Sequence, residues 1–216
     1  MKISLKVLLL VSLIAFGFNI TSSNAQGDNP MRFGIKGGIN FSNLYAEDVD
    51  ETKMATGFNL GLFAKLPIAN RFALQPEIYY TSKGGEVTYK GGSAVGTVGY
   101  DLDYIEVPLM LVINFTDRFN IHAGPYAAFL VRGKANNESD VTLFNFEDDL
   151  DTGDFNTFEA GIAIGAGIDF KAISLGVRYS QGLTEVAKER DFLGTSYKFL
   201  DAKNGVINLY ITLALN

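Results

Sequence analysis

The sequence contains no cysteine and a single histidine in 216 residues. Without cysteine there is no disulfide framework and no lipid-modified N-terminal cysteine, so the fold must be stabilised by other means. A lone histidine, His122, also excludes a cluster of nitrogen and sulfur ligands for a transition metal.

Basic residues and long apolar runs are scarce as well. After residue 25 no apolar run is long enough for a membrane helix. The formal net charge is −6, and removal of Lys2 and Lys6 leaves 16 basic against 24 acidic residues, a charge of −8. This acidity excludes nucleic acid as a partner, because binding to phosphates requires a basic surface.

The first 25 residues have the pattern of a secretory signal peptide. Lys2 and Lys6 precede an apolar stretch over 7–18, and small residues, Ser23 and Ala25, stand before the expected cleavage site. We therefore expect residues 1–25 to be a signal peptide and residues 26–216 to form one domain.

That domain is predicted to consist of eight strands. Each segment alternates apolar and other residues with a period of two; in the second the apolar face comprises Phe58, Leu60, Leu62, Ala64 and Leu66. The eight segments are 32–42, 57–66, 71–81, 103–115, 120–131, 157–170, 172–183 and 205–216.

The connections between these segments alternate between short and long. Short turns are expected around 67–70, 116–118 and 170–173, and long polar loops at 43–56, 82–102, 133–156 and 184–204. This asymmetry is typical of outer-membrane barrels, which place short turns in the periplasm and long loops outside. We therefore predict an all-β, eight-stranded, antiparallel up-and-down transmembrane β-barrel in the cell outer membrane, with both termini periplasmic.

A soluble lipocalin-type barrel is the alternative, with its apolar face turned inward. Two features favour the membrane. The aromatic residues of the apolar face cluster at the strand ends, as in the girdles of a lipid-facing band. The opposite face is rich in glycine and alanine, which suit a narrow, packed lumen.

Charged residues share the lumen-facing parity. Glu106, within the oily run YIEVPLMLVINF (104–115), is predicted to face inward with Lys36, Glu77 and Arg178. Lys65, Arg71 and Glu159 lie nearer the strand ends. Eight strands leave an interior that side chains can fill, so we expect these charges to pair as a plug. A bulge or a missing ladder bond is expected at each of three prolines, Pro76, Pro108 and Pro125.

Several motifs resemble those of the porin-family, PorT-like outer-membrane β-barrel proteins. They are LQPEIYYTSKGG (74–85), YIEVPLML (104–111), AGPYAAFL (123–130), GAGIDF (165–170) and LGVRYSQGLTEV (175–186). The resemblance extends over about 31–216. It implies an eight-stranded barrel in the outer membrane and supplies no catalytic residues; the word porin does not itself imply a pore.

The residues offer little chemistry of their own. His122 is expected inside the barrel as a hydrogen-bonded structural residue, so we predict no catalytic residues, no enzyme activity and no cofactor. The loop at 133–155 is strongly acidic. Within it Asp149, Asp151 and Asp154 are close enough in sequence to suggest a calcium site, although their spacing differs from an EF-hand and a solvated loop is the alternative.

We therefore expect a monomeric, non-enzymatic barrel surrounded by outer-membrane lipid, with a structural or surface-interaction role. Two alternatives remain open. One is a narrow porin-like channel, and the other is an accessory role in protein export or surface assembly, in which envelope proteins would be the partners.

If Asp149, Asp151 and Asp154 bind calcium, the ion should protect the acidic loop from proteolysis at millimolar or lower concentration. The measurement is limited proteolysis of the folded protein with calcium and with a chelator. Identical cleavage under both conditions would leave a solvated acidic loop as the interpretation.

Overall fold

The structure is a computed structural model that describes residues 30–46, 51–91, 94–139, 146–149, 156–184, 189–192, 195–198 and 202–215. Eight antiparallel strands close into a barrel, because β4 pairs with both β3 and β5 and β1 pairs with both β2 and β11. The prediction of an eight-stranded antiparallel barrel is thus confirmed. The strands are β1 (Arg32–Ala46), β2 (Glu51–Ala69), β3 (Phe72–Gly91), β4 (Ala94–Asn114), β5 (Phe119–Ser139), β7 (Phe158–Asp169), β8 (Ile173–Gly182) and β11 (Ala202–Ala214).

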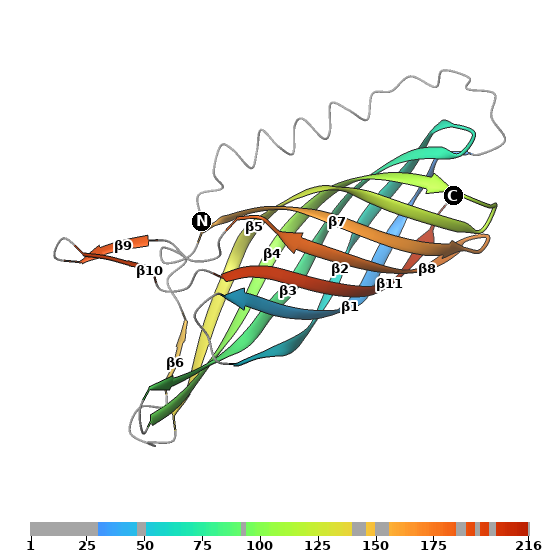
Figure 1. Ribbon diagram of the computed structural model, residues 1–216. Helices are drawn as coiled ribbons and strands as arrows, with labels where there is room; N and C mark the ends of the chain where they lie inside the picture. Colours follow the sequence, from blue (N-terminus) through green and yellow to red (C-terminus); the bar gives the residue numbers. More distant parts are fainter. Residues whose placement is uncertain are drawn as a thin grey trace.

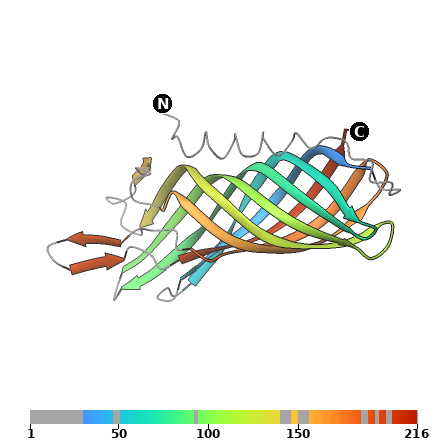
Figure 2. The same ribbon diagram turned by 90° about the horizontal axis from the view of Figure 1, so that it is seen from above.

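Three short strands lie outside this ring (Figure 1). β6 (Phe146–Asp149) pairs with the end of β5, and β9 (Glu189–Phe192) pairs with β10 (Thr195–Lys198) in a separate hairpin. Figure 2 shows this hairpin beyond the end of the barrel that lies opposite the C terminus. Within the described ranges, no helix has the length and apolarity needed to cross a membrane.

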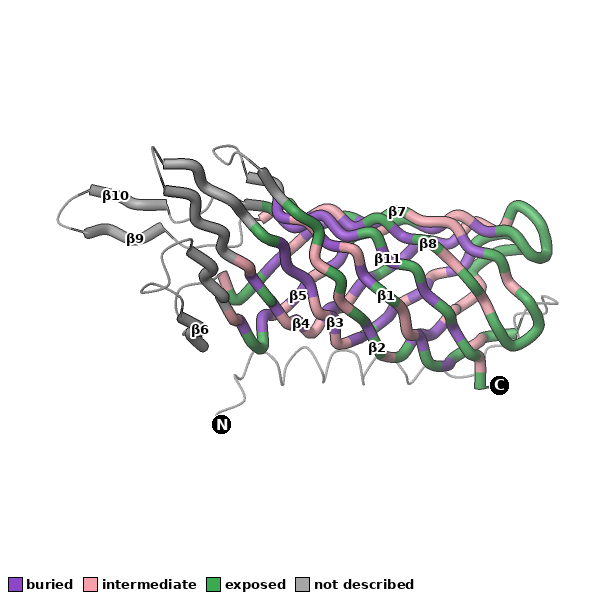
Figure 3. Tube along the Cα trace, turned by 90° about the horizontal axis from the view of Figure 1, so that it is seen from below, coloured by how far each residue is buried: buried purple, intermediate pink, exposed green. Residues whose placement is uncertain are grey.

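Buried and exposed residues alternate along the strands of the barrel (Figure 3). The exposed ones are mostly apolar, whereas many of the buried ones are polar or charged. Leucine and isoleucine side chains are exposed on the outer face, with Leu60 at 60% and Ile164 at 57%. Exposed phenylalanines lie toward the ends of this band, as in the aromatic girdles of membrane barrels. One residue departs from the prediction: Ala64 is buried, because its single methyl group lies opposite the larger Phe33 in the register.

The three prolines interrupt the ladder without shifting it. On β3, pairing with β2 is interrupted between Leu74 and Glu77, and pairing with β4 is interrupted between Pro76 and Tyr79. Pairing between β4 and β5 is interrupted beside Pro125. The register is the same before and after each gap. Ladder hydrogen bonds are therefore missing at the prolines, as expected. Because no bulge forms there, the alternation of inward-facing and outward-facing side chains is preserved.

The strands are longer than predicted on one side of the barrel. β3, β4 and β5 have 20, 21 and 21 residues, whereas β7 and β8 have 12 and 10. The ranges 43–56, 82–102 and 133–156 are thus partly strand. For 83–100 this agrees with the strand extension and turn that its glycines and tyrosines predict. At 43–56 and 133–156 the boundaries were wrong, because a strand beyond the membrane-spanning part no longer needs an apolar face. We call residues 51–54, 84–91, 94–101 and 134–139 the sheet extension; the register aligns them in one row of strands.

A bulge in β2 lets β1 contact β3 directly below this extension. The register of β2 on β3 shifts between Met54 and Asn59. Backbone groups of β3 in this region bond to β1 side chains instead. Asn40 Nδ2 donates to the Ser82 carbonyl at 2.9 Å, and the Gly84 amide donates to Ser42 Oγ at 2.9 Å. These side chains therefore satisfy buried backbone groups at a bulge, where regular pairing is lost.

Asn40 also holds a buried ring of amides together. Its Nδ2 lies 2.8 Å from Thr81 Oγ1, and its Oδ1 accepts from Nδ2 of Asn59 and of Asn208, both at 2.9 Å. The side chain thus connects β1 with β2, β3 and β11.

Asn40→Ala should lower the free energy of unfolding by about 1–3 kcal/mol or more, because several buried groups lose their partner at once. Urea unfolding in lipid vesicles, followed by the heat-modified shift on gels, measures the change. Asn70→Ala, in an exposed turn, is the matched control and should have little effect. Equal stability of the two variants would show that the bulge does not depend on Asn40.

Candidate functional site

The buried charges of the lumen form two clusters. The first, the Glu77 cluster, consists of Glu77, Lys36, Arg178 and Gln75. Arg178 donates from Nη1 and Nη2 to the two carboxylate oxygens of Glu77 at 2.7 and 2.8 Å. Lys36 Nζ lies 2.8 Å from Glu77 Oε2, and Gln75 Nε2 donates to Glu77 Oε1 at 2.7 Å. All of these side chains are buried.

The pair formed by Glu77 and Arg178 spans the barrel. Glu77 is on β3 and Arg178 is on β8, which lie four strands apart in either direction around the ring. A two-pronged bond between guanidinium and carboxylate is the strongest common form of ion pair and fixes both groups in one plane. It therefore sets the distance between opposite walls.

The second group, the Lys83 cluster, consists of Lys83, Glu106, Glu159, Tyr126 and Asn204. Lys83 Nζ lies 2.6 Å from Glu106 Oε2 and 3.0 Å from Glu159 Oε1. Tyr126 donates its hydroxyl to Glu159 Oε1 at 2.7 Å, and Asn204 Nδ2 donates to Glu159 Oε2. One lysine thus neutralises part of the charge of two carboxylates from β4 and β7.

The two clusters have opposite net charges. The Glu77 cluster holds two cations and one carboxylate, whereas the Lys83 cluster holds one cation and two carboxylates. Tyr79 lies between them: its hydroxyl donates to Glu106 Oε1 at 2.5 Å, and its ring lies 5.0 Å from Lys36 Nζ. Together they form a neutral unit of three bases and three acids, which is the condition for holding charges in an apolar surrounding.

Glycines on β7 and β8 make room for large polar side chains on neighbouring strands. A Cβ on Gly165 would lie 2.5 Å from His122 Nε2, and one on Gly176 would lie 2.4 Å from the Tyr210 hydroxyl. At Gly161 it would lie 2.5 Å from the Tyr126 ring. The small residues that the sequence places on the inner face therefore correspond to the space that these rings fill.

His122 lies inside the barrel. Its Nδ1 is 3.2 Å from Asn120 Oδ1 and its Nε2 is 3.3 Å from the Tyr210 hydroxyl. Neither partner is a serine or a carboxylate, so this arrangement is that of a structural residue. Nearby, an interior cavity of about 20 Å³ is lined by residues that include His122 and Gln75. This is enough space for a single water molecule.

The predicted lumen charges divide between these sites. Lys36, Glu77 and Arg178 are in direct contact, whereas Glu106 belongs to the Lys83 cluster. Among the charges expected near the strand ends, Glu159 also joins the Lys83 cluster. Lys65 pairs with Asp169 at 2.8 Å at the mouth of the barrel, and Arg71 lies exposed in the turn after β2.

Sequence reasoning missed Lys83. It shares the inward parity of Glu77 and Tyr79, so extending the third alternating segment by two residues would have included it. The sequence indicates that residues 83–100 form a strand extension and a turn above the membrane, so Lys83 was not counted among the lumen charges.

The structure describes residues 133–139 and 146–149 of the acidic loop. The Asp149 backbone pairs with Lys134 at the end of β6, and Asp151 and Asp154 are not among the described residues. Within the part of the chain that the structure describes, no group of three or more histidine, cysteine or acidic residues is arranged to hold a metal. Calcium binding by this loop stays a prediction.

Comparison with known proteins agrees with this architecture. The family model described as "Outer membrane protein beta-barrel domain" matches residues 22–188. Among curated proteins, none matches the chain significantly.

Several solved outer-membrane barrels are similar in structure. Neisserial surface protein A is 13% identical, with 86% of this chain and 99% of that chain covered and a TM-score of 0.51. Ail of Yersinia pestis is 16% identical, with 87% and 100% covered and a TM-score of 0.47. OprG of Pseudomonas aeruginosa is 12% identical, with 85% and 91% covered and a TM-score of 0.38. At these identities the likeness concerns the fold alone.

Arg178→Ala should destabilise the barrel by about 3–5 kcal/mol, because it leaves part of the Glu77 charge buried without its cross-barrel partner. The temperature at which the folded form converts to the slower-migrating form on gels should fall accordingly. Lys171→Ala, in an exposed turn, is the control and should leave this temperature unchanged. An Arg178→Ala protein as heat-stable as the control would refute the packed-plug interpretation.

Proposed function

Because the chain belongs to the outer membrane protein β-barrel domain family, we propose that it is a closed, non-enzymatic barrel that displays its sheet extension and acidic loops for surface interaction. The observation that carries this proposal is the neutral unit of six buried charges in the lumen. It favours a plug over a channel, since a conducting pore needs a continuous path of water.

The contacts inside the barrel support a closed lumen. The Glu77 cluster joins opposite walls, and the ring of amides around Asn40 crosses the interior from β11 to β3. Toward the loop end Leu44 and Leu102 have no exposed surface. The polar groups of the lumen bond to one another, and apolar side chains lie above them. Hydrated ions would therefore find no continuous polar path through the barrel.

The sheet extension supports the surface role. About 9–11 residues of a strand suffice to cross a membrane, so β3, β4 and β5 continue well beyond it. The described side chains there include the exposed Lys53 and Glu86, which form an ion pair at 3.6 Å, and the exposed Asp101. A paired sheet is a more rigid support for loops than single chains would be.

The proposed orientation places this extension outside the cell. The described turns at 70–71, 115–118 and 170–172 are short, and short turns face the periplasm in barrels of this class. Both termini would then be periplasmic, as the even strand number requires.

In planar bilayers the wild-type protein should show no large, stable conductance. Glu77→Gln is the informative variant, because it leaves Lys36 and Arg178 without their shared carboxylate and should raise the frequency of openings. Asn70→Ala is the control. Large stable conductance of the wild type would replace this proposal with the narrow-channel alternative.

The surface role can be tested with a shortened hairpin. Glu86 and Gly99 are directly opposite in the register, so residues 87–98 can be replaced by Asn-Gly without changing the strands below. A photo-crosslinker at Asp101 should capture a defined partner on intact cells in the full-length protein and lose it in the shortened one.

Position 117, in a turn at the opposite end, is the matched control and should give no such product. Capture of export or assembly components from position 117 instead would favour the accessory role that the PorT-like resemblance suggests.

Labels at Ser93 should be accessible on intact cells and labels at Asp117 should not; the reverse result would invert the orientation.

A further inference from the structure

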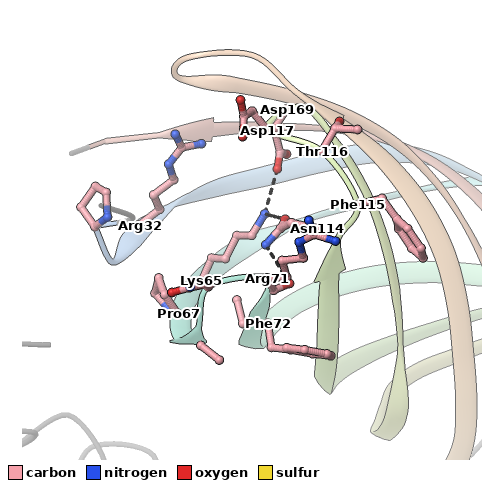
Figure 4. Close-up of a pocket in the computed structure, with 14 residues that line it drawn as sticks. Arg32, Lys65, Pro67, Arg71, Phe72, Asn114, Phe115, Thr116, Asp117 and Asp169 are labelled. Carbon is pink, nitrogen blue, oxygen red and sulfur yellow. Dashed lines mark hydrogen bonds and ion pairs between the residues drawn. The ribbon is translucent and has the colours of Figure 1, made fainter. Parts of the chain in front are cut away.

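A depression of about 340 Å³ lies at the turn end of the barrel, opposite the sheet extension. Its lining comes from the start of β1, the end of β2, the turn at 70–71, the turn after β4 and the end of β7. Figure 4 shows three cationic side chains, Arg32, Lys65 and Arg71, around this hollow. We call it the turn-end depression.

The three cations are not equally engaged. Lys65 Nζ lies 2.8 Å from Asp169 Oδ2 and donates to Asn114 Oδ1 at 3.3 Å, so it is part of the wall. Neither guanidinium, of Arg32 or Arg71, makes a hydrogen bond or ion pair with the described residues. Arg32 is half-buried, and Arg71 is exposed.

The carboxylates in the lining cancel only part of the positive charge. Asp169 Oδ2 accepts from both Lys65 and Asn120, and the remaining carboxylate, Asp117, is exposed on the turn after β4. Three bases and two acids leave the depression with a net positive charge. The whole chain, by contrast, has a net charge of −6. A local cationic hollow in an acidic protein attracts anions to this end.

The chemistry of the lining favours a phosphate group. Guanidinium groups match the geometry of phosphate oxygens with paired hydrogen bonds. Asn70 and Thr116 add uncharged polar groups to the wall. The volume exceeds that of a bare phosphate and leaves room for a substituent the size of glycerol. Phe72 and Phe115, both exposed, line the rim where the aromatic girdle meets the membrane surface.

We propose that the turn-end depression binds a small phosphate ester through Arg32 and Arg71. The same chemistry is presented by a free phosphorylated molecule and by the headgroup of a phospholipid in the adjoining leaflet. This site is separate from the lumen plug and from the sheet extension. Its presence or absence therefore leaves the proposed surface role unaffected.

The test uses the full protein in an uncharged detergent, with inorganic phosphate and glycerol 3-phosphate as probes in titration calorimetry. The variants are Arg32→Gln, Arg71→Gln and the two combined. The controls are Arg118→Gln and Lys171→Gln, at exposed positions of the same end that do not line the depression. The heat-modified gel shift verifies that each variant is folded. Arg71→Gln changes only an exposed turn residue, so it keeps the test valid if Arg32→Gln disturbs β1.

Binding of glycerol 3-phosphate should weaken at least about tenfold in the double variant, since hydrogen bonds to charged groups contribute that much, and less than about twofold in the controls. A second arm measures phospholipid retained by protein released from nanodiscs, using native mass spectrometry. Loss of retained lipid in the double variant, without binding of the free ester, would identify the headgroup as the ligand. Equal behaviour of wild type and double variant in both arms, or an equal loss in the controls, would overturn the proposal.

Discussion

The bond between Glu77 and Arg178 is the interaction on which the interior depends. A barrel of eight strands has too little room for the water that would otherwise hydrate these charges, so each charge needs a protein partner. Because the two residues come from opposite strands of the ring, their bond also fixes the width of the barrel. Lys36 and Gln75 also bond to the carboxylate oxygens of Glu77. The rest of the lumen is arranged around this carboxylate.

The space inside the barrel is shared unequally between its walls. β5 and β11 contribute the large rings of His122 and Tyr210, whereas the neighbouring strands β7 and β8 have glycines at the paired positions. A Cβ on Gly165 or Gly176 would overlap with these rings. The same logic applies at the β2 bulge, where Asn40 and Ser42 replace backbone partners. Packing and hydrogen bonding thus select the residue size strand by strand.

Much of this could be read from the sequence, because a period of two is a local property. It identified the eight strands and put Glu106 and Arg178 on the inner face, and the prolines preserved that parity by interrupting bonds without adding residues. The period of two does not show which side chains pair across the lumen, because that pairing depends on how far neighbouring strands are shifted along one another in the barrel. It therefore did not indicate that Glu106 bonds to Lys83 and not to Arg178. The strand ends were also misplaced, since beyond the lipid the alternation of apolar residues no longer marks a strand.

The position of Glu77 and Arg178 in the chain has a consequence for assembly. In an open sheet, with β1 and β11 not yet joined, β3 and β8 would be held far apart by the strands between them. Lys36, on the terminal strand β1, would likewise be carried at a free edge. Neutralisation of the lumen and closure of the ring must therefore occur together. A partly curled intermediate would have to carry unmatched charges toward the lipid, which disfavours release into the membrane before the last pair of strands has zipped shut.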